Sequence, residues 1–136
     1  MNEISGMKEA FQEAKVVFLT TFKNGEETSR PMTNFNSDPY ETFWFPTYRD
    51  TKKVENIKQQ KKVLVTFPAE EEGKFYEIEG AAEFADREFV KNNWQWWYLY
   101  WHPHQRRRFW FSKEGEHPER MIILIHPKNA RKVTEK

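Results

Sequence analysis

Residues 46–58 read Pro-Thr-Tyr-Arg-Asp-Thr-Lys-Lys-Val-Glu-Asn-Ile-Lys, and this stretch carries an aromatic strand directly into a helix. We predict the helix over residues 50–60. Lys52 and Lys53 fall in its first turn. Unpaired backbone N–H groups make a helix start positive, so a cation there is unfavourable by roughly 0.3–1 kcal/mol. The sequence therefore raises the question of which negative group would compensate the two lysines.

The residues around this helix start have the chemistry of an anion site. Thr47 ends the preceding strand, and either Asp50 or Thr51 can cap the helix. Hydroxyl groups, ammonium groups and free backbone N–H groups would then meet within one turn, which is how helix starts bind phosphate. The alternative is that both lysines are solvated surface residues. The spacing alone leaves the two interpretations equally open, because no glycine-rich loop accompanies it.

A second feature is the stretch Ser29-Arg-Pro-Met-Thr33, which lies in a strand predicted over residues 27–36. Pro31 has no backbone N–H to donate, so it predicts a bulge or an unpaired position in that strand. Backbone groups left exposed beside a bulge can bind the edge of a heterocyclic ring. An edge strand with a capped bulge explains the same residues equally well.

The rest of the chain reads as short strands joined by hairpin turns, with a few helices. Asn24-Gly25 is a strong hairpin signal, and the strand before it, apolar on both faces, is predicted to be central. This order favours a mainly β fold, an antiparallel barrel with helices packed outside, in one domain over residues 1–136 with a basic, frayed tail at 128–136. The other predicted elements are helices at 4–14 and 86–101 and strands at 16–22, 42–46, 62–67, 75–85 and 121–125.

Composition limits the classes of function. The chain has a net charge of +1, so no global basic field attracts nucleic acid. It has no cysteine, which excludes disulfides, thiolate metal sites and a cysteine nucleophile and is compatible with the cytoplasm, where we place it. No signal peptide is visible, and no apolar run is long enough to span a membrane.

Three further clusters of residues stand out in the sequence. The aromatic residues of 94–101 present apolar surface on two sides of a helix, which favours dimer packing over ligand contact. Arg106-Arg-Arg108, next to Phe109 and Trp110, resembles a single-strand nucleic-acid site, but ion pairs or a ligand cleft explain it better. His102 and His104 have no evident third ligand, so we predict no metal site.

Together these motifs resemble the pyridoxamine 5′-phosphate oxidase-like split-barrel flavoproteins, above all the small general-stress-protein branch. The resemblance covers roughly residues 4–127 and depends on the order of the motifs. Its most specific part is Thr47-Tyr-Arg-Asp-Thr-Lys-Lys53. The other motifs are Val16–Gly25, Ser29–Met32, Phe43–Pro46, Val63–Phe67 and Tyr76–Ala81.

The resemblance implies a six-stranded antiparallel split β-barrel of the FMN-binding type and a homodimer with FMN at the subunit interface. Arg30 and the backbone of Pro31, Met32 and Thr33 would lie along the isoalloxazine ring and the ribityl chain. Pro46 and Thr47 would lie beside the cofactor, with Thr47 on the ring or phosphate side, and Thr51, Lys52 and Lys53 would hold the phosphate.

One departure affects the second subunit. Members of the family often follow the last strand with an aromatic segment that contacts the neighbouring flavin, whereas this chain continues His126-Pro-Lys-Asn-Ala-Arg-Lys-Val. Trp110 is our candidate substitute. The oxidase's own substrate-binding residues have no clear counterpart, so pyridoxamine phosphate is not expected as a substrate.

The resemblance implies an FMN-binding redox protein, expected to pass electrons or hydride between a reduced nicotinamide and a small acceptor. No catalytic side chain can be assigned, since the flavin would supply the reaction. Two alternatives remain open: a flavin-binding or stress-related module without turnover, and a deazaflavin- or haem-binding member of the same fold.

Overall fold

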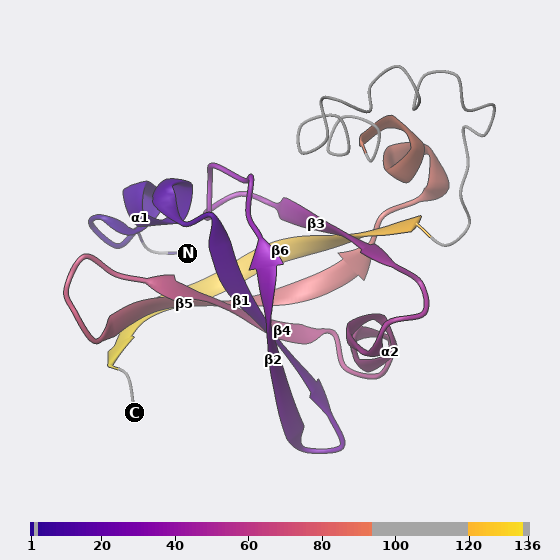
Figure 1. Ribbon diagram of the computed structural model, residues 1–136, viewed down its shortest axis with the longest axis horizontal. Coiled ribbons are helices and arrows are strands. Elements are labelled where there is room, and N and C mark those ends of the chain that lie inside the picture. Colours follow the sequence, from indigo (N-terminus) through magenta and orange to yellow (C-terminus); the bar gives the residue numbers. More distant parts are fainter. Residues whose placement is uncertain (2, 94–119, 135–136) are drawn as a thin grey trace.

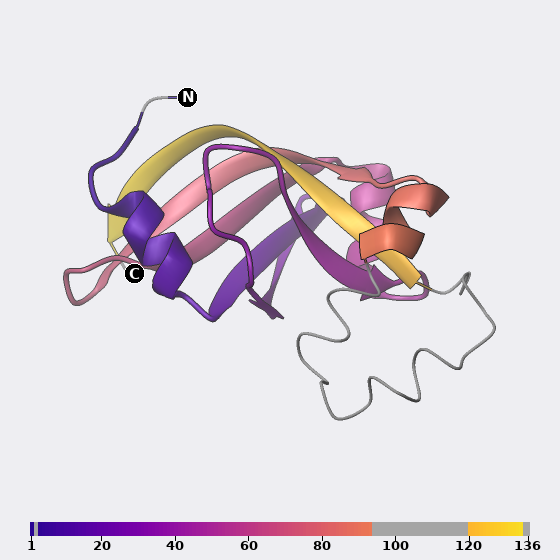
Figure 2. The same cartoon turned by 90° about the horizontal axis from the view of Figure 1, so that it is seen from above.

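Six strands form a single antiparallel sheet in the order β2-β1-β4-β5-β6-β3. The computed structural model describes residues 1, 3–93 and 120–134. The sheet curls so strongly that it forms a split barrel with β2 and β3 at its free edges (Figures 1 and 2). The predicted fold class is therefore confirmed. The strands are β1 (Val16–Lys23), β2 (Glu26–Thr33), β3 (Phe43–Tyr48), β4 (Lys62–Pro68), β5 (Lys74–Phe84) and β6 (Arg120–Thr134).

Helices cover both ends and part of the outside of the barrel. Helix α1 (Met7–Glu13) and helix α2 (Lys52–Gln59) lie at opposite ends of the curled sheet (Figures 1 and 2). Residues 87–93 form a third helical segment, which packs on the outside through Val90 against Ile122, Trp44 and Leu124. No helix in the described part of the chain has both the length and the apolar character needed to cross a membrane.

The core fills the inside of the barrel because strand residues alternate between its two faces. Phe11 of α1 lies across one end of the core, with ring centroids 5.1 Å from Phe43 and 5.2 Å from Phe67. The fully buried side chains on the strands include Val17, Leu19, Phe45, Val63, Val65, Phe67, Tyr76, Ile78, Ile123 and Ile125.

Asn36 closes the gap between the two free edges near α1. Its amide oxygen accepts from the Trp44 backbone N–H at 3.2 Å, and its amide nitrogen donates to the Trp44 carbonyl at 2.9 Å. One side chain thus replaces a pair of strand–strand hydrogen bonds just after β2 ends. Asn34 fastens the same segment to α1 through the carbonyls of Phe11 and Ala14.

The hairpin prediction at Asn24-Gly25 is confirmed. Both residues have positive φ, 52° and 82°, and they join Lys23 to Glu26. This is the two-residue turn whose twist matches that of the strands. The predicted central position of β1 is also confirmed, since β1 pairs with β2 on one side and β4 on the other.

Two expectations need correction. Of the two alternatives at Pro31, the bulge is wrong, because Pro31 sits in regular register opposite Phe18. The missing N–H of Pro31 is tolerated because β2 is an edge strand, whose outer side needs no hydrogen-bond partner. The chain beyond Lys128 does not fray, since β6 pairs with β5 as far as Thr134. Its basic residues face acidic partners instead, and Arg131 bonds to Glu77 at 2.6 Å. Of the helix predicted over 86–101, residues from 94 onward lie outside the described residues.

Candidate functional site

Three elements meet at the hydroxyl of Thr21. The guanidinium of Arg30 on β2 donates to Thr21 Oγ1 at 2.9 Å, and the amide of Asn56 on α2 donates to the same oxygen at 3.0 Å. Arg30 pairs with Leu19, and residues paired across a strand ladder lie on the same face, so Arg30 belongs to the face that carries the buried Leu19 and Thr21. Thr21 is fully buried and Asn56 is 6% exposed. The contact therefore lies inside the barrel end that α2 covers.

Lys53 brings a second positive charge to this place. Burial and then the nearby charge of Arg30 lower the pKa of Lys53, and burial also lowers the pKa of the Arg30 guanidinium. Within the described ranges, neither side chain has a carboxylate partner, and Glu55 of α2 pairs with Lys23. Two partly buried cations without a counter-ion are unfavourable, so this arrangement suits an anionic ligand.

Two buried polar atoms near the start of α2 have no hydrogen-bond partner in the described part of the chain. They are Arg30 Nη2 and Thr47 Oγ1. Thr47 is only 4% exposed, and it lies on β3 shortly before the chain enters α2. Leaving such a group unpaired costs about 1–3 kcal/mol, so buried orphans in a native protein call for an explanation. A polar ligand would supply the missing partners.

The first turn of α2 also keeps its backbone donors. Thr51 occupies the N-cap position, as predicted, but its hydroxyl donates back to the Tyr48 carbonyl at 3.0 Å and makes no capping bond. The N–H groups at the helix start are therefore not satisfied by that side chain. The structure thus combines an uncapped helix start with the cations of Arg30 and Lys53.

The two predicted lysines point in different directions. Lys53 lies near Arg30, whereas Lys52 lines a separate hollow of about 590 Å³ together with Arg49, Thr51 and Lys58. Successive residues of an α-helix are about 100° apart, which explains the divergence. The sequence placed both lysines in one turn but could not show which of them faces the barrel.

The other predicted residues divide between the two faces of the sheet. Met32 packs against the core, while Pro31 and Thr33 are exposed on the outer face of β2. Pro46 is half-buried and pairs with Ile122 on β6. Trp110 lies outside the described residues.

Sequence reasoning missed Thr21 and Asn56. Thr21 sits in an apolar strand, where a β-branched residue reads as a strand former. Asn56 had a usable signal, since it stands beside the apolar residues Val54 and Ile57 on the inward side of α2, and all three are buried. A polar residue on a buried helix face needs a hydrogen-bond partner, so its position alone pointed to a polar contact.

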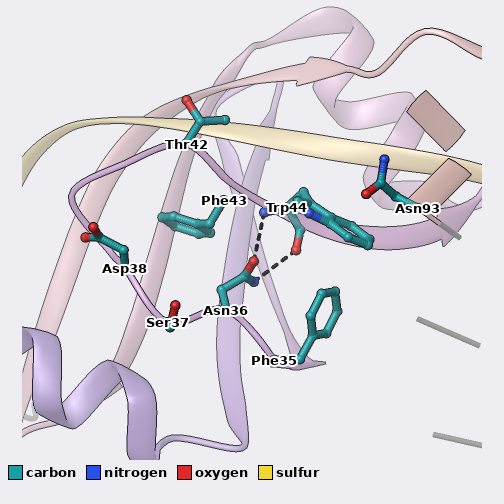
Figure 3. Close-up of a pocket in the computed structure, with 8 residues that line it drawn as sticks. All are labelled: Phe35, Asn36, Ser37, Asp38, Thr42, Phe43, Trp44 and Asn93. Atoms are coloured by element: carbon teal, nitrogen blue, oxygen red, sulfur yellow. Dashed lines mark hydrogen bonds between the residues drawn. The ribbon is translucent and has the colours of Figure 1, made fainter. Parts of the chain in front are cut away.

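A second hollow, of about 350 Å³, lies between the segment after β2, the start of β3 and the third helix (Figure 3). Its aromatic wall includes Phe35 and Trp44, with ring centroids 4.8 Å apart. Asn36 is committed to the Trp44 backbone, and Thr42 is hydrogen-bonded to His126 at 2.9 Å. None of the predicted site residues lines this hollow. In the described ranges, no group of three or more histidine or acidic side chains could hold a metal ion.

Residues 2–133 match the family model described as "Pyridoxamine 5'-phosphate oxidase like". A comparison with curated proteins gave no match.

Three solved structures have similar folds. A protein from Listeria innocua, named as a candidate pyridoxamine 5′-phosphate oxidase, is 23% identical with a TM-score of 0.67, covering 92% of this chain and 93% of its own. General Stress Protein 26 from Bacillus anthracis is 22% identical with a TM-score of 0.67, covering 94% and 91%. An FAD-binding protein from Mesorhizobium loti is 15% identical with a TM-score of 0.69, covering 96% and 94%. At these identities the likeness concerns the fold.

Proposed function

This chain belongs to the pyridoxamine 5′-phosphate oxidase-like family, and we propose that it is an FMN-binding oxidoreductase whose cofactor phosphate binds at the start of α2. One observation carries the proposal: a buried donor of Arg30 has no partner in the described residues. Neither Arg30 nor Lys53, whose pKa the charge of Arg30 lowers, has a carboxylate partner there. A phosphate dianion would neutralise the two charges and accept from that donor.

The chain's residues would hold the phosphate by charge and by hydrogen bonds. Arg30 and Lys53 supply the cations, and the backbone N–H groups at the start of α2 supply further donors. Thr51 and Lys52, which line the separate hollow, are assigned to the phosphate by the family motif alone. Hydrogen bonds to charged groups contribute about 1.5–3 kcal/mol each. After the costs of desolvation and ordering, several of them are enough for micromolar binding, about 8 kcal/mol.

The ring end of the cofactor is assigned by the family motif. The backbone of Pro31, Met32 and Thr33, together with Pro46 and Thr47, would lie along the ring and the ribityl chain, and Trp110 would come from the second subunit. The unpaired Thr47 hydroxyl is compatible with this role, because a flavin offers both donors and acceptors. When bound, FMN supplies hydride transfer between a reduced nicotinamide and a small acceptor, and the protein supplies binding and orientation.

We further propose that the protein is a homodimer. Val16 and Phe18 are 48% and 43% exposed on the outer face of β1. The exposed Pro31 pairs with Phe18 on the neighbouring strand. Apolar surface on a sheet face favours burial against another chain, by about 25 cal/mol per Å². Light scattering should give a dimer mass for the wild type, and Phe18→Glu should shift that mass toward a monomer; a monomeric wild type would refute the proposal.

Purified protein tests the cofactor directly. We expect absorbance bands near about 375 and 450 nm and the mass of FMN in the released ligand. Another released mass, such as FAD or a deazaflavin, would overturn the FMN assignment. Steady oxidation of NADH or NADPH would support the oxidoreductase. Tight FMN binding without turnover would instead indicate a flavin-binding module that catalyses no reaction of its own.

A further inference from the structure

We propose that Thr21 and Asn56 are positioning residues that hold the Arg30 guanidinium ready for a phosphate ester, so that the site prefers FMN over riboflavin. This inference rests on the proposed function and extends it to residues that the family motif does not include. Its basis is geometric, since one buried hydroxyl joins β1, β2 and α2 through two hydrogen bonds.

The hydroxyl of Thr21 is fully used as an acceptor. A threonine oxygen has two lone pairs, and here one receives Arg30 Nη1 and the other receives Asn56 Nδ2. The guanidinium is therefore fixed by one of its nitrogens. The second nitrogen, Nη2, is buried and has no partner among the described residues, which leaves it to a ligand.

This anchor opposes the repulsion between the two cations. Lys53 lies close enough to Arg30 for the charge of Arg30 to lower the pKa of Lys53. A free arginine side chain would turn away from such a neighbour toward water, because it has many rotamers of similar energy. The bond to Thr21 keeps the guanidinium beside Lys53, so less orientation is lost when an anion binds.

The same oxygen also sets the position of α2. Asn56 is one turn beyond the start of α2, and its bond to Thr21 ties the helix to the strand that carries the anchor. The Thr21 oxygen thus fixes the positions of both the Arg30 guanidinium and the start of α2. A phosphate group that contacts both of them needs this fixed separation, because donors that are already in place lose less freedom when the ligand binds.

The test compares FMN with riboflavin, which lacks the phosphate, by quenching of flavin fluorescence on apoprotein. For Thr21→Val we expect FMN affinity to fall about tenfold or more, while riboflavin affinity stays within about twofold. Thr21→Ser keeps the hydroxyl and should restore the preference for FMN. Thr20→Val is the matched control, because Thr20 is a buried neighbour on the opposite face of β1, away from Arg30, and should leave the preference for FMN over riboflavin unchanged.

Asn56→Leu gives a second route if Thr21→Val folds poorly. It should weaken FMN in the same direction, and Thr21→Val with Asn56→Leu should lose little more than Thr21→Val alone, because both act through one oxygen. The ³¹P signal of bound FMN should shift in both variants and return in Thr21→Ser.

The outcomes separate this inference from the proposed function. If the wild type binds FMN no better than riboflavin, the proposed function is wrong. If the wild type prefers FMN and Thr21→Val keeps that preference, only the positioning role is wrong. Equal losses for both flavins, or an equal effect of Thr20→Val, would also overturn the positioning role, because they indicate a general structural defect.

Discussion

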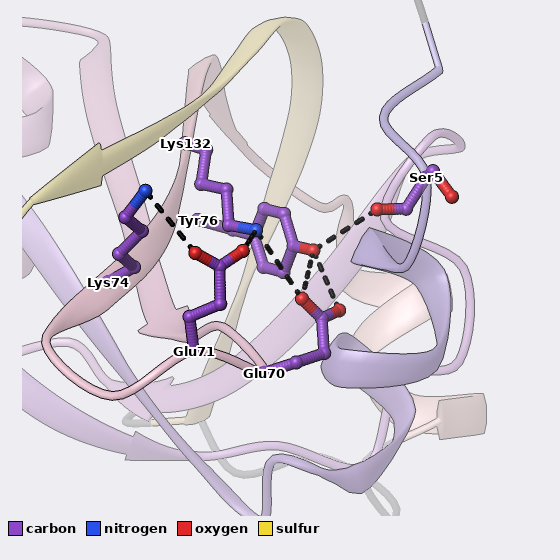
Figure 4. A network of polar contacts seen from close by, with 6 residues as sticks. All are labelled: Ser5, Glu70, Glu71, Lys74, Tyr76 and Lys132. Atoms are coloured by element: carbon purple, nitrogen blue, oxygen red, sulfur yellow. Dashed lines mark hydrogen bonds and ion pairs between the residues drawn. The ribbon is translucent and has the colours of Figure 1, made fainter.

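The two ends of the barrel balance their charges in opposite ways. At the α1 end, the Tyr76 hydroxyl lies 2.7 Å from Glu70 Oε1, and Lys132 forms ion pairs with both Glu70 and Glu71 (Figure 4). At the α2 end, Arg30 and Lys53 lie together with no carboxylate partner in the described ranges. The groups at the first end find their partners within the described chain, whereas Arg30 Nη2 at the second end has none there.

The pKa shifts record the same difference. At the α1 end, hydrogen bonds, above all the one from Tyr76, and also the charge of Lys132 lower the pKa of Glu70. The hydrogen bond to Glu71 raises the pKa of Lys132. Glu71 and Lys132 each favour the charged form of the other, and Tyr76 favours the ionised form of Glu70. At the α2 end, burial and Arg30 lower the pKa of Lys53, so each cation disfavours the other. The paired charges at the α1 end stabilise the folded state. The cations at the α2 end, which have no carboxylate partner in the described ranges, destabilise it, and destabilising features of this kind are typical of functional sites.

The largest effect should come from removing both cations at the α2 end. We expect Arg30→Met with Lys53→Met to weaken FMN about 100-fold, or about 2.7 kcal/mol, with little change for riboflavin, as measured by fluorescence titration. Lys132→Met is the matched control, since it removes a positive charge from the opposite end. If Lys132→Met weakens FMN as much, the effect reflects overall charge and the comparison between the two ends fails.

The next effect concerns stability at the α1 end. Tyr76 is fully buried, and its single hydroxyl proton is shared between Glu70 and the Ser5 carbonyl at 3.2 Å. The hydrogen bond to the Glu70 carboxylate is the stronger of the two, because hydrogen bonds to charged groups are stronger than those to neutral groups. Tyr76→Phe should lower the free energy of unfolding by about 1–2 kcal/mol in urea titrations. FMN affinity should not change, and a loss of affinity would mean that the two ends are coupled.

The hydrogen bond between Tyr76 and Glu70 should also make the stability of the protein depend on pH in the acidic range. The pKa of Glu70 is lower in the folded protein than its ordinary value, so its contribution is present above that ordinary value and is lost as the pH falls through the folded pKa. Tyr76→Phe removes the main cause of the shift. The stability difference between wild type and variant should therefore shrink as the pH falls from neutral through the lowered pKa of Glu70. A difference that stays constant over this range would show that the hydroxyl acts without the carboxylate.

The sequence was sufficient for the scaffold because local signals agreed with one another. The turn at Asn24-Gly25 and the run of short strands, including the one predicted at 75–85, predicted the antiparallel sheet, and the segment 46–58 predicted the strand-to-helix junction. The error at Lys128 had a physical cause. A run of basic residues reads as a solvated tail until the acidic partners on β5 are known, and those partners lie more than fifty positions away in sequence.

The site was only partly accessible to the same reasoning. Arg30 and Lys53 could be named from a motif, but their approach to each other depends on how β2 curls toward α2, which no local signal encodes. Thr21 is one of two adjacent threonines, and only the register of β1 against β2 shows which of them faces Arg30. Long-range register is the information that a single sequence lacks.

Removing one cation should stabilise the ligand-free protein. We expect Lys53→Met to raise the melting temperature by about 2–4 °C, corresponding to about 1 kcal/mol, because methionine keeps the packing of the stem and removes the disfavoured charge. Lys52→Met, on the exposed side of α2, should have little effect. Since the folded pKa of Lys53 is lowered, wild-type stability should rise between that value and about 10.5, and the gain from Lys53→Met should fade over the same range. A destabilised Lys53→Met variant would contradict this account.

The smallest effect tests the orphan hydroxyl on β3. Valine has nearly the shape of threonine, so Thr47→Val removes a buried oxygen that has no partner in the described part of the chain without opening a cavity. The ligand-free protein should gain about 0.5–1 kcal/mol in thermal unfolding, while FMN affinity should fall by a few-fold if the cofactor supplies the missing partner. A loss of stability in the ligand-free protein would mean that folding already satisfies this hydroxyl. The α2 end would then resemble the α1 end more closely than its unpaired atoms indicate.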